Sequence, residues 1–141
     1  MESDELVLNI YTDGGARGNP GPAAVGVHIE DIQGNHVVSL GKKIGHTTNN
    51  VSEYKAVIEA LDLALELNKR ISKINFYLDS NLVVSQLNGV FKLKSPVLRE
   101  LLLKIREKEG ELECPITYSY IPREKNLKAD RLVNLALDSL A

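Results

Sequence analysis

The sequence predicts a single α/β domain, residues 1–141, in which a five-stranded mixed sheet is flanked by about four helices. The order of the elements favours this fold, since three β-forming segments come first and helical segments then alternate with two more β-forming segments. A chain of 141 residues with 43% hydrophobic residues can bury one core but is too short for two domains of ordinary size. The sequence contains no internal repeat and no low-complexity tract.

The first three strands are expected to pair as an antiparallel unit. Residues 6–13 are rich in β-forming side chains, and this strand is expected to end at Asp13, before two glycines. After a rigid loop rich in glycine and proline, residues 24–30 and 36–44 flank a polar turn like the two arms of a hairpin.

The rest of the chain alternates helices and strands. Residues 51–68 follow several N-cap candidates and carry an apolar stripe with helical spacing. A short strand over residues 74–79 also ends in a carboxylate, Asp79. The remaining elements are expected to be helices over residues 80–87, 95–109 and 126–140 and a strand over residues 116–121. The inward residues of the last helix are expected to be Ala129, Val133, Ala136, Leu137 and Leu140.

The composition excludes several functional classes. The chain has 17 basic and 19 acidic residues, a net charge of −2, so any polyanion must be bound locally and not by an overall positive field. The single cysteine, Cys114, cannot form an internal disulfide or a zinc cluster, which favours a reducing compartment. The acidic N-terminus lacks a secretory signal and no uncharged stretch exceeds 12 residues, so we expect a soluble, cytoplasmic protein that does not enter a membrane.

Four acidic residues occupy positions that need an explanation. Asp13 and Asp79 end two strands, whereas Glu53 and Asp130 lie on the apolar faces of their helices, where a charge is costly. Structural alternatives exist for all four. Asp13 and Asp79 could be turn or cap residues, and Asp130 could complement a helix dipole. Glu53 could reach back in a capping box that begins at Asn50.

Taken together, the four acids predict a cation site. Neighbouring strands ending in Asp13 and Asp79 would place two carboxylates at one sheet edge, near the helices that carry Glu53 and Asp130. Such a cluster repels itself unless divalent cations neutralise it, and oxygen ligands favour Mg²⁺ or Mn²⁺ over zinc. The histidines lack the spacing of metal ligands, and we expect all three on the surface of the sheet or its loops. They are His28, His36 and His46.

Four motifs, in order along the chain, resemble those of the ribonuclease H type I family. They are residues 11–22 (YTDGGARGNPGP), 48–53 (TNNVSE), 78–80 (LDS) and 126–130 (NLKAD). The resemblance covers essentially the whole chain, and four ordered motifs are far more specific than a single one. It implies a ribonuclease H-like fold, in which three antiparallel strands are followed by two parallel ones.

The resemblance also implies an activity. Asp13, Glu53, Asp79 and Asp130 match the four metal-binding acids of the family. The implied reaction is cleavage of the RNA strand of an RNA/DNA hybrid, which leaves 5′-phosphate and 3′-hydroxyl ends. It implies two divalent ions, Mg²⁺ or Mn²⁺, roughly 3.5–4 Å apart, one to ready a water for in-line attack and the other to stabilise the departing 3′ oxygen. We expect Asp13, on the central strand, to bridge both ions.

Substrate contacts follow from the same resemblance. Asn19, Asn49 and Asn50 match positions that touch the nucleic-acid backbone, and neutral amides can bind both a phosphate and a 2′-hydroxyl. Thr48 matches a position that holds a phosphate of the DNA strand. Gly14, beside the first acid, is also an expected substrate contact.

The first departure from the family pattern is a missing protrusion. Many members carry a basic, tryptophan-bearing protrusion after the helix that follows the third motif, but here residues 88–94 run almost directly into the next helix and the chain has no Trp. Lys92 and Lys94 begin a stretch, residues 92–108, that contains six basic residues and two acids. This stretch is either a compensating phosphate contact or a solvated helix face.

The second departure is in the loop before Asp130, where better-known members have a histidine. Residues 122–125 read Pro-Arg-Glu-Lys, which resembles the shorter archaeal and bacterial branch, in which an arginine holds this place. Arg123 cannot transfer protons at neutral pH, so its expected role is charge stabilisation or phosphate positioning. The alternative is an ordinary surface arginine.

Two other functions stay open at this point. Enzymes of DNA transposition or integration use a related fold and acidic metal sites, but this chain has ribonuclease H spacing and no accessory DNA-binding domain. A binding module that had lost catalysis would have no need for all four acids, although the fold alone does not separate these possibilities. No obligate protein partner is evident, and we expect a monomer.

Overall fold

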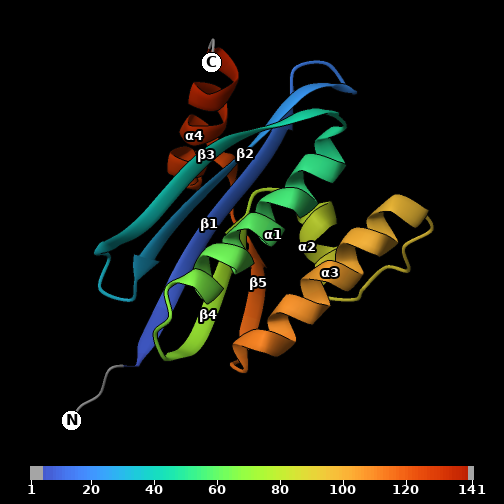
Figure 1. Ribbon diagram of the computed structural model, residues 1–141. Helices are drawn as coiled ribbons and strands as arrows, with labels where there is room; N and C mark the ends of the chain where they lie inside the picture. Colours follow the sequence, from blue (N-terminus) through green and yellow to red (C-terminus); the bar gives the residue numbers. More distant parts are fainter. Residues whose placement is uncertain (1–4, 140–141) are drawn as a thin grey trace.

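The computed structural model describes residues 5–139 and contains a five-stranded sheet with helices on both faces (Figure 1). The strands are β1 (Leu6–Ala16), β2 (Gly21–Asp31), β3 (His36–Thr47), β4 (Ile71–Leu78) and β5 (Ile116–Tyr120), in the order β3-β2-β1-β4-β5. β1 pairs antiparallel with β2, and β2 with β3, whereas β4 pairs in parallel with both β1 and β5. The mixed sheet predicted from the sequence is confirmed.

Helices cover the sheet on its two faces. In Figure 1, α1 (Asn49–Glu66), α2 (Asn81–Leu87) and α3 (Pro96–Leu112) lie in front of the sheet, and α4 (Leu127–Asp138) lies behind it. The predicted helix boundaries differ from these by no more than three residues. A short 3-10 helix, η1 (Arg123–Lys125), precedes α4 and was not predicted.

The main core lies between the sheet and the front helices. α1 buries four residues of the predicted stripe, Val57, Ala60, Leu61 and Ala64. Fully buried side chains of β1, β2 and β4 pack against this stripe, and they include Leu8, Ile10, Val27, Ile29, Ile74 and Phe76. In α4, Ala129 and Val133 are buried as predicted, Ala136 and Leu137 are half-buried, and Leu140 lies outside the described residues.

β1 is longer than predicted. It does not end at Asp13 but continues to Ala16, because its last residues keep pairing with β2. The parallel pairing of β1 with β4 stops at Tyr11. Asp13 is therefore paired with β2 but lies beyond the end of the pairing with β4. On the side of β4, it has no strand partner.

α4 approaches the sheet closely at two glycines. Gly26 of β2 and Gly41 of β3 are paired with each other. A β carbon on Gly26 would overlap the carbonyl oxygen of Ala129, and one on Gly41 would lie 2.7 Å from the carbonyl oxygen of Leu132. Since Gly26 is also paired with Asp13 of β1, this contact places the first turns of α4 beside Asp13.

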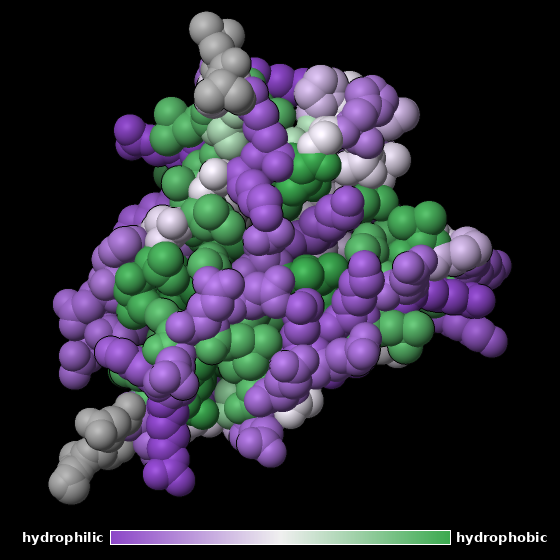
Figure 2. Space-filling view, viewed as in Figure 1, coloured by the Kyte–Doolittle hydropathy of each residue, from purple (hydrophilic) through white to green (hydrophobic). Residues whose placement is uncertain are grey.

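The surface is mainly hydrophilic, with scattered apolar side chains on the face that Figure 2 shows. Exposed large apolar residues include Val90, Phe91 and Val97, in and next to the segment that joins α2 to α3. Among residues 5–139, no helix has the length and apolar character needed to cross a membrane.

Replacing Gly26 with alanine should destabilise the protein. The Gly26→Ala side chain would meet a backbone carbonyl, so α4 would have to shift, and we expect the free energy of unfolding to fall by about 1–3 kcal/mol. Urea denaturation followed by circular dichroism measures this change.

Gly110→Ala is the matched control, because Gly110 lies in α3 with no atom within 4 Å of an added β carbon. This variant should be unchanged or more stable by about 0.5–1 kcal/mol, since alanine is the better helix former. A Gly26→Ala protein as stable as wild type would contradict the close contact of α4 with the sheet.

Candidate active site

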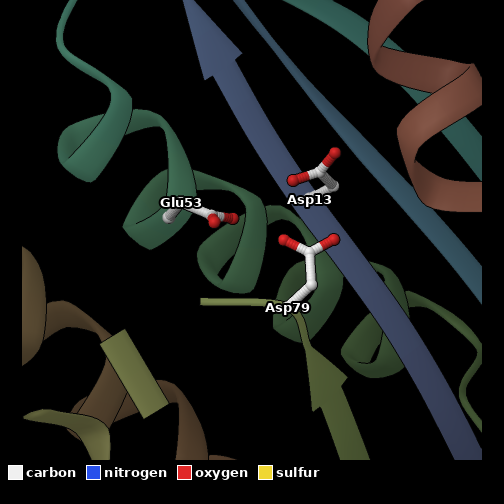
Figure 3. Close-up of side chains that lie close together, drawn as sticks. All are labelled: Asp13, Glu53 and Asp79. Carbon is white, nitrogen blue, oxygen red and sulfur yellow. The ribbon is translucent and has the colours of Figure 1, made fainter. Parts of the chain in front are cut away.

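Three acidic side chains meet where β1 runs past the end of β4. Asp13 of β1, Glu53 of α1 and Asp79, directly after β4, each offer a carboxylate oxygen within 4.8 Å of the other two. Figure 3 shows the three carboxylates pointing toward one another from these separate elements. Asp13 and Glu53 are only 8% and 7% exposed, and Asp79 is half-buried. In the part of the chain that the structure describes, no other group of three such ligands is this close.

Glu53 reaches the cluster because the backbone of α1 touches β1. Only a glycine fits at position 14, since a β carbon there would overlap the backbone of Ser52. The Gly14 amide donates a hydrogen bond to Glu53 Oε1 at 2.9 Å. The capping-box alternative is wrong, because Thr48 caps α1 and Asn50 lies within the helix. The Glu53 carboxylate therefore binds the central strand and not its own helix.

A buried amide joins Asp79 to β1. The Asn126 side chain donates to Asp79 Oδ2 at 3.0 Å and to the Thr12 carbonyl oxygen at 2.9 Å. Asn126 is 1% exposed and directly precedes α4. These contacts could not be predicted from the sequence, because an asparagine before a helix is an ordinary cap signal and nothing in the pattern shows which way its side chain turns.

Asp130 stands at the margin of the cluster. It lies half-buried in the first turn of α4 and is not part of the group whose oxygens lie within 4.8 Å. Its negative charge is nevertheless close enough to raise the pKa of Asp13. The expected convergence of four acids is therefore met by three, while Asp130 affects Asp13 electrostatically from α4.

Burial and mutual repulsion favour protonation of the cluster. The pKa of Asp13 is raised to about 8, mainly by desolvation. The negative charges of Asp79 and Asp130 raise this pKa further, whereas the positive charge of Arg123 and the hydrogen bond from the Gly14 amide lower it. Desolvation, with the charges of Asp13 and Asp79, also raises the pKa of Glu53 well above its ordinary value. Divalent cations relieve such repulsion, and an all-oxygen donor set suits Mg²⁺ or Mn²⁺. The residues present therefore fit a divalent metal site.

The chain matches known proteins along most of its length. The family model described as "Reverse transcriptase-like" matches residues 11–136. A protein of Halobacterium salinarum named ribonuclease HI is 41% identical over 132 residues, which cover 93% of this chain and 64% of that protein. The crystal structure of LC11-RNase H1 in complex with an RNA/DNA hybrid is 45% identical, with a TM-score of 0.89 and coverage of 93% of this chain and 96% of that one. The chain belongs to the ribonuclease H type I family.

Some relatives are considerably longer than this chain. A bifunctional protein of Mycobacterium tuberculosis is 39% identical over 133 residues, which cover 94% of this chain but only 36% of that protein. Within the ribonuclease H fold, α2 and α3 are joined here by residues 88–95, which contain no helix. The short connection between these two helices that the sequence predicts is confirmed.

The loop residues expected to touch nucleic acid are exposed near the end of β1. The Asn49 backbone amide donates to Asn19 Oδ1 at 3.0 Å, and Asn49 Oδ1 accepts from the Ala16 amide at 2.9 Å. Among the described residues, the Nδ2 groups of Asn19 and Asn49 have no partner, and neither has the exposed side chain of Asn50. This loop therefore presents amide donors to the solvent.

The predicted basic residues fall into two groups. Arg123 is exposed in η1, forms no ion pair within residues 5–139, and is close enough to lower the pKa of Asp13. Lys92 and Lys94 are exposed between α2 and α3, and no described contact joins them to the cluster. Three other basic residues of the 92–108 stretch serve the fold through hydrogen bonds or ion pairs, namely Arg99, Arg106 and Lys108.

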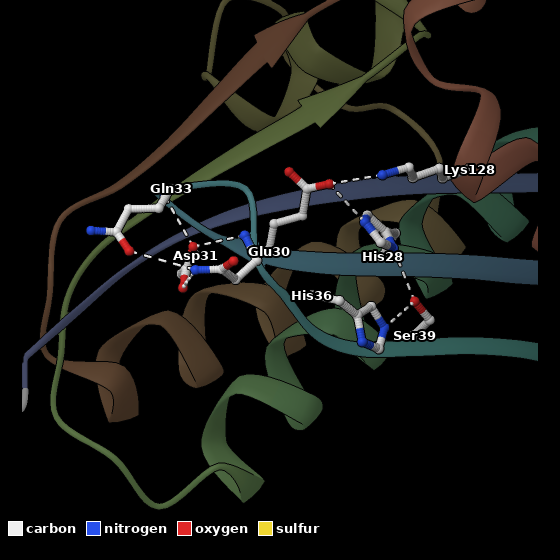
Figure 4. Close-up of polar contacts among 8 residues, drawn as sticks. His28, Glu30, Asp31, Gln33, His36, Ser39 and Lys128 are labelled. Atoms are coloured by element: carbon white, nitrogen blue, oxygen red, sulfur yellow. Dashed lines mark hydrogen bonds and ion pairs between the residues drawn. The ribbon is translucent and has the colours of Figure 1, made fainter.

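His28 is buried, contrary to the expectation that all three histidines lie on the surface. Its Nδ1 contacts the Ser39 hydroxyl and its Nε2 contacts Glu30 Oε2, both at 2.9 Å (Figure 4). Lys128, at the start of α4, donates to the same Glu30 oxygen at 3.1 Å. The His28 ring also lies against Tyr11 and His36, with ring centroids 6.2 Å and 5.5 Å away. The sequence pattern of β2 alone does not reveal these contacts with neighbouring strands. The other two histidines, His36 and His46, are exposed as predicted.

Asp13→Asn should stabilise the metal-free protein at neutral and mildly alkaline pH. The pKa of Asp13 is about 8 in the folded protein against an ordinary value of 3.8, so between these values the folded state holds a proton that the unfolded chain releases. The contribution of Asp13 to stability is fully present below pH 3.8 and is lost as the pH rises toward about 8. Because asparagine does not ionise, the Asp13→Asn protein does not lose stability in this way as the pH rises.

Thermal unfolding in EDTA measures this effect. Asp13→Asn should melt several degrees above wild type near pH 8, and the difference should vanish near pH 4. Asp138→Asn is the control, because Asp138 is exposed on α4 and paired with Arg17 at 2.7 Å, away from the cluster. A lower melting temperature for Asp13→Asn at every pH would show that the acid is a structural cap.

Proposed function

We propose that the chain, acting as one ribonuclease H domain, hydrolyses the RNA strand of RNA/DNA hybrids and leaves 5′-phosphate and 3′-hydroxyl ends. The observation that carries the proposal is the group of three carboxylates within 4.8 Å of one another, formed by Asp13, Glu53 and Asp79. Membership of the ribonuclease H family and the hybrid bound to LC11-RNase H1 support the choice of substrate.

We assign two divalent cations, Mg²⁺ or Mn²⁺, to this site. Asp13, Glu53 and Asp79 would hold them, with Asp130 as an additional ligand, and Asp13 is the residue proposed to serve both. When bound, a pair of such cations activates a water for in-line attack on phosphorus and neutralises charge on the departing 3′ oxygen. The carboxylates then become favourable in their ionised form, because the cations offset the repulsion among them.

The protein's own groups hold the acids in place and complement the charge of the phosphate. The Gly14 amide fixes Glu53, and Asn126 fixes Asp79. Arg123 carries a permanent positive charge near Asp13, and we propose that it stabilises negative charge that builds on the scissile phosphate.

The proposed substrate contacts lie on the loop that carries the free amide donors. The Nδ2 groups of Asn19 and Asn49, with Asn50, would donate to phosphate or 2′-hydroxyl oxygens. Thr48 uses its oxygen to cap α1 and retains its hydroxyl hydrogen for a phosphate of the DNA strand. The Gly14 amide is committed to Glu53, so any contact of Gly14 with substrate would use its carbonyl oxygen or α carbon. Lys92 and Lys94 are proposed as a more distant phosphate contact.

The purified protein should cut the RNA strand of a labelled hybrid only when Mg²⁺ or Mn²⁺ is present. Asp13→Asn, Glu53→Gln and Asp79→Asn should each remove nearly all turnover, because each removes a carboxylate from the cluster. Gel analysis of end-labelled hybrid measures cleavage, with a DNA duplex as the control substrate and Asp138→Asn as the control variant.

Activity that survives EDTA, or near wild-type rates in all three variants, would overturn the metal assignment. Cleavage of the DNA duplex in place of the hybrid would favour the transposition or integration class. Tight hybrid binding by wild type without cleavage, with Mg²⁺ or Mn²⁺ present, would favour a binding module.

Arg123→Ala should lower kcat by something on the order of 10²-fold with a smaller change in KM, since the proposed interaction is stronger in the transition state. Arg123→Lys should recover only part of the activity, because an ammonium lacks the planar fork of the guanidinium. Lys125→Ala is the control, as an exposed basic residue of the same short helix. Steady-state kinetics on a short hybrid measure kcat and KM for each variant. A rise in KM at constant kcat would assign Arg123 to uniform substrate binding instead.

A further inference from the structure

One buried side chain connects the three chain segments that carry Asp13, Asp79 and Asp130. The Asn126 amide nitrogen donates to the carbonyl oxygen of Thr12, the residue before Asp13, and to Asp79 Oδ2. The Asn126 backbone carbonyl accepts from the Asp130 amide at 3.1 Å. The residue is 1% exposed, so these contacts are made away from water.

The Asn126 side chain does not do what asparagine ordinarily does at this position. Residues that precede a helix commonly cap it by accepting a hydrogen bond from a backbone amide of the first turn. Asn126 occupies the cap position of α4, yet its side chain makes no such bond. Both hydrogens of the amide are directed instead to β1 and Asp79, and within residues 5–139 its buried Oδ1 has no partner. A buried oxygen left unpaired is costly, which indicates that the direction of the amide matters.

The chemistry of the position favours an amide. The parallel pairing of β1 and β4 ends at Tyr11, so beyond that point no strand residue of β4 is paired with Thr12, and the Asn126 amide bonds its carbonyl oxygen. The same group must donate to a carboxylate without adding charge to a self-repelling cluster. An aspartate has no amide hydrogen to donate, and an alanine has no polar group at all.

We propose that Asn126 is a positioning residue that fixes Asp79 relative to Asp13 and so sets the affinity of the site for divalent cations. The inference rests on the proposed function only in taking the three carboxylates to hold those cations. Asn126 binds Asp79 Oδ2, and the Asp79 carboxylate offers an oxygen within 4.8 Å of those of Asp13 and Glu53. Groups that orient a metal-binding carboxylate in this way typically contribute about 10–100-fold to metal affinity.

Isothermal titration of the metal-free protein with MgCl₂, and separately with MnCl₂, tests the proposal without any nucleic acid. Asn126→Ala should raise the dissociation constant about 10–100-fold while circular dichroism shows a folded protein. Asn126→Ser is the second variant, because serine keeps a good cap residue for α4 but lacks the amide. The matched control is Asn134→Ala, within α4, where the exposed Asn134 amide donates to the Asp130 carbonyl oxygen at 3.0 Å. This control should bind both ions with wild-type affinity.

The dependence of hybrid cleavage on Mg²⁺ concentration is a second measurement, and a purely structural role of Asn126 would leave it unchanged. If Asn126 acts through the cations, kcat of Asn126→Ala should rise toward that of wild type as Mg²⁺ is increased, and KM for the hybrid should stay unchanged. Wild-type metal affinity in both Asn126 variants, with lower melting temperatures, would overturn the proposal and leave Asn126 a structural residue.

The two claims fail in different ways. A protein whose metal affinity depends on Asn126 but which cuts no hybrid overturns the proposed function alone. A protein that cuts the hybrid while Asn126→Ala and Asn126→Ser bind both ions like wild type overturns the role of Asn126 alone. A wild-type protein that binds neither ion and cuts no hybrid overturns both.

Discussion

Backbone contact at two glycines brings the acidic residues together. Gly14 lets α1 lie directly against β1 on one face of the sheet, and Gly26 lets α4 lie against β2 on the other face, beside Asp13. A side chain at either glycine would separate a helix from the sheet, and with it Glu53 or Asp130. The positions of the acids therefore follow from main-chain packing more than from the acids' own interactions, which are repulsive.

That repulsion shapes the chemistry of the site. Asp13 and Glu53 are buried beside each other, and the metal-free protein favours their protonated forms. Two groups oppose this effect at both acids, the Gly14 amide and the positive charge of Arg123. A site that is unfavourable when fully ionised, and that contains only oxygen ligands, is suited to hard divalent cations. Bound cations would therefore relieve the same repulsion that disfavours the ionised carboxylates in the metal-free protein.

Much of this arrangement could be predicted from the sequence. The positions of the strands and helices along the chain and the apolar stripe of α1 follow from local periodicity, and the placement of Glu53 on that stripe indicated an acid that turns inward. The length of β1 could not be predicted, because its last residues are strand only through their partners in β2.

The remaining discrepancies also arise from contacts between distant segments. His28 is buried among side chains of neighbouring strands, and Glu53 binds the Gly14 amide instead of capping its own helix. The inward turn of the Asn126 side chain depends on where β4 ends. Patterns within a segment do not contain this information.

Anomalous diffraction from crystals soaked in MnCl₂ tests most directly whether the carboxylate cluster is a cation site. We expect a manganese peak bounded by Asp13, Glu53 and Asp79, and loss of that peak in Glu53→Gln crystals soaked in the same way. Manganese bound only at other acidic positions, with none among these three carboxylates at saturating concentration, would contradict it.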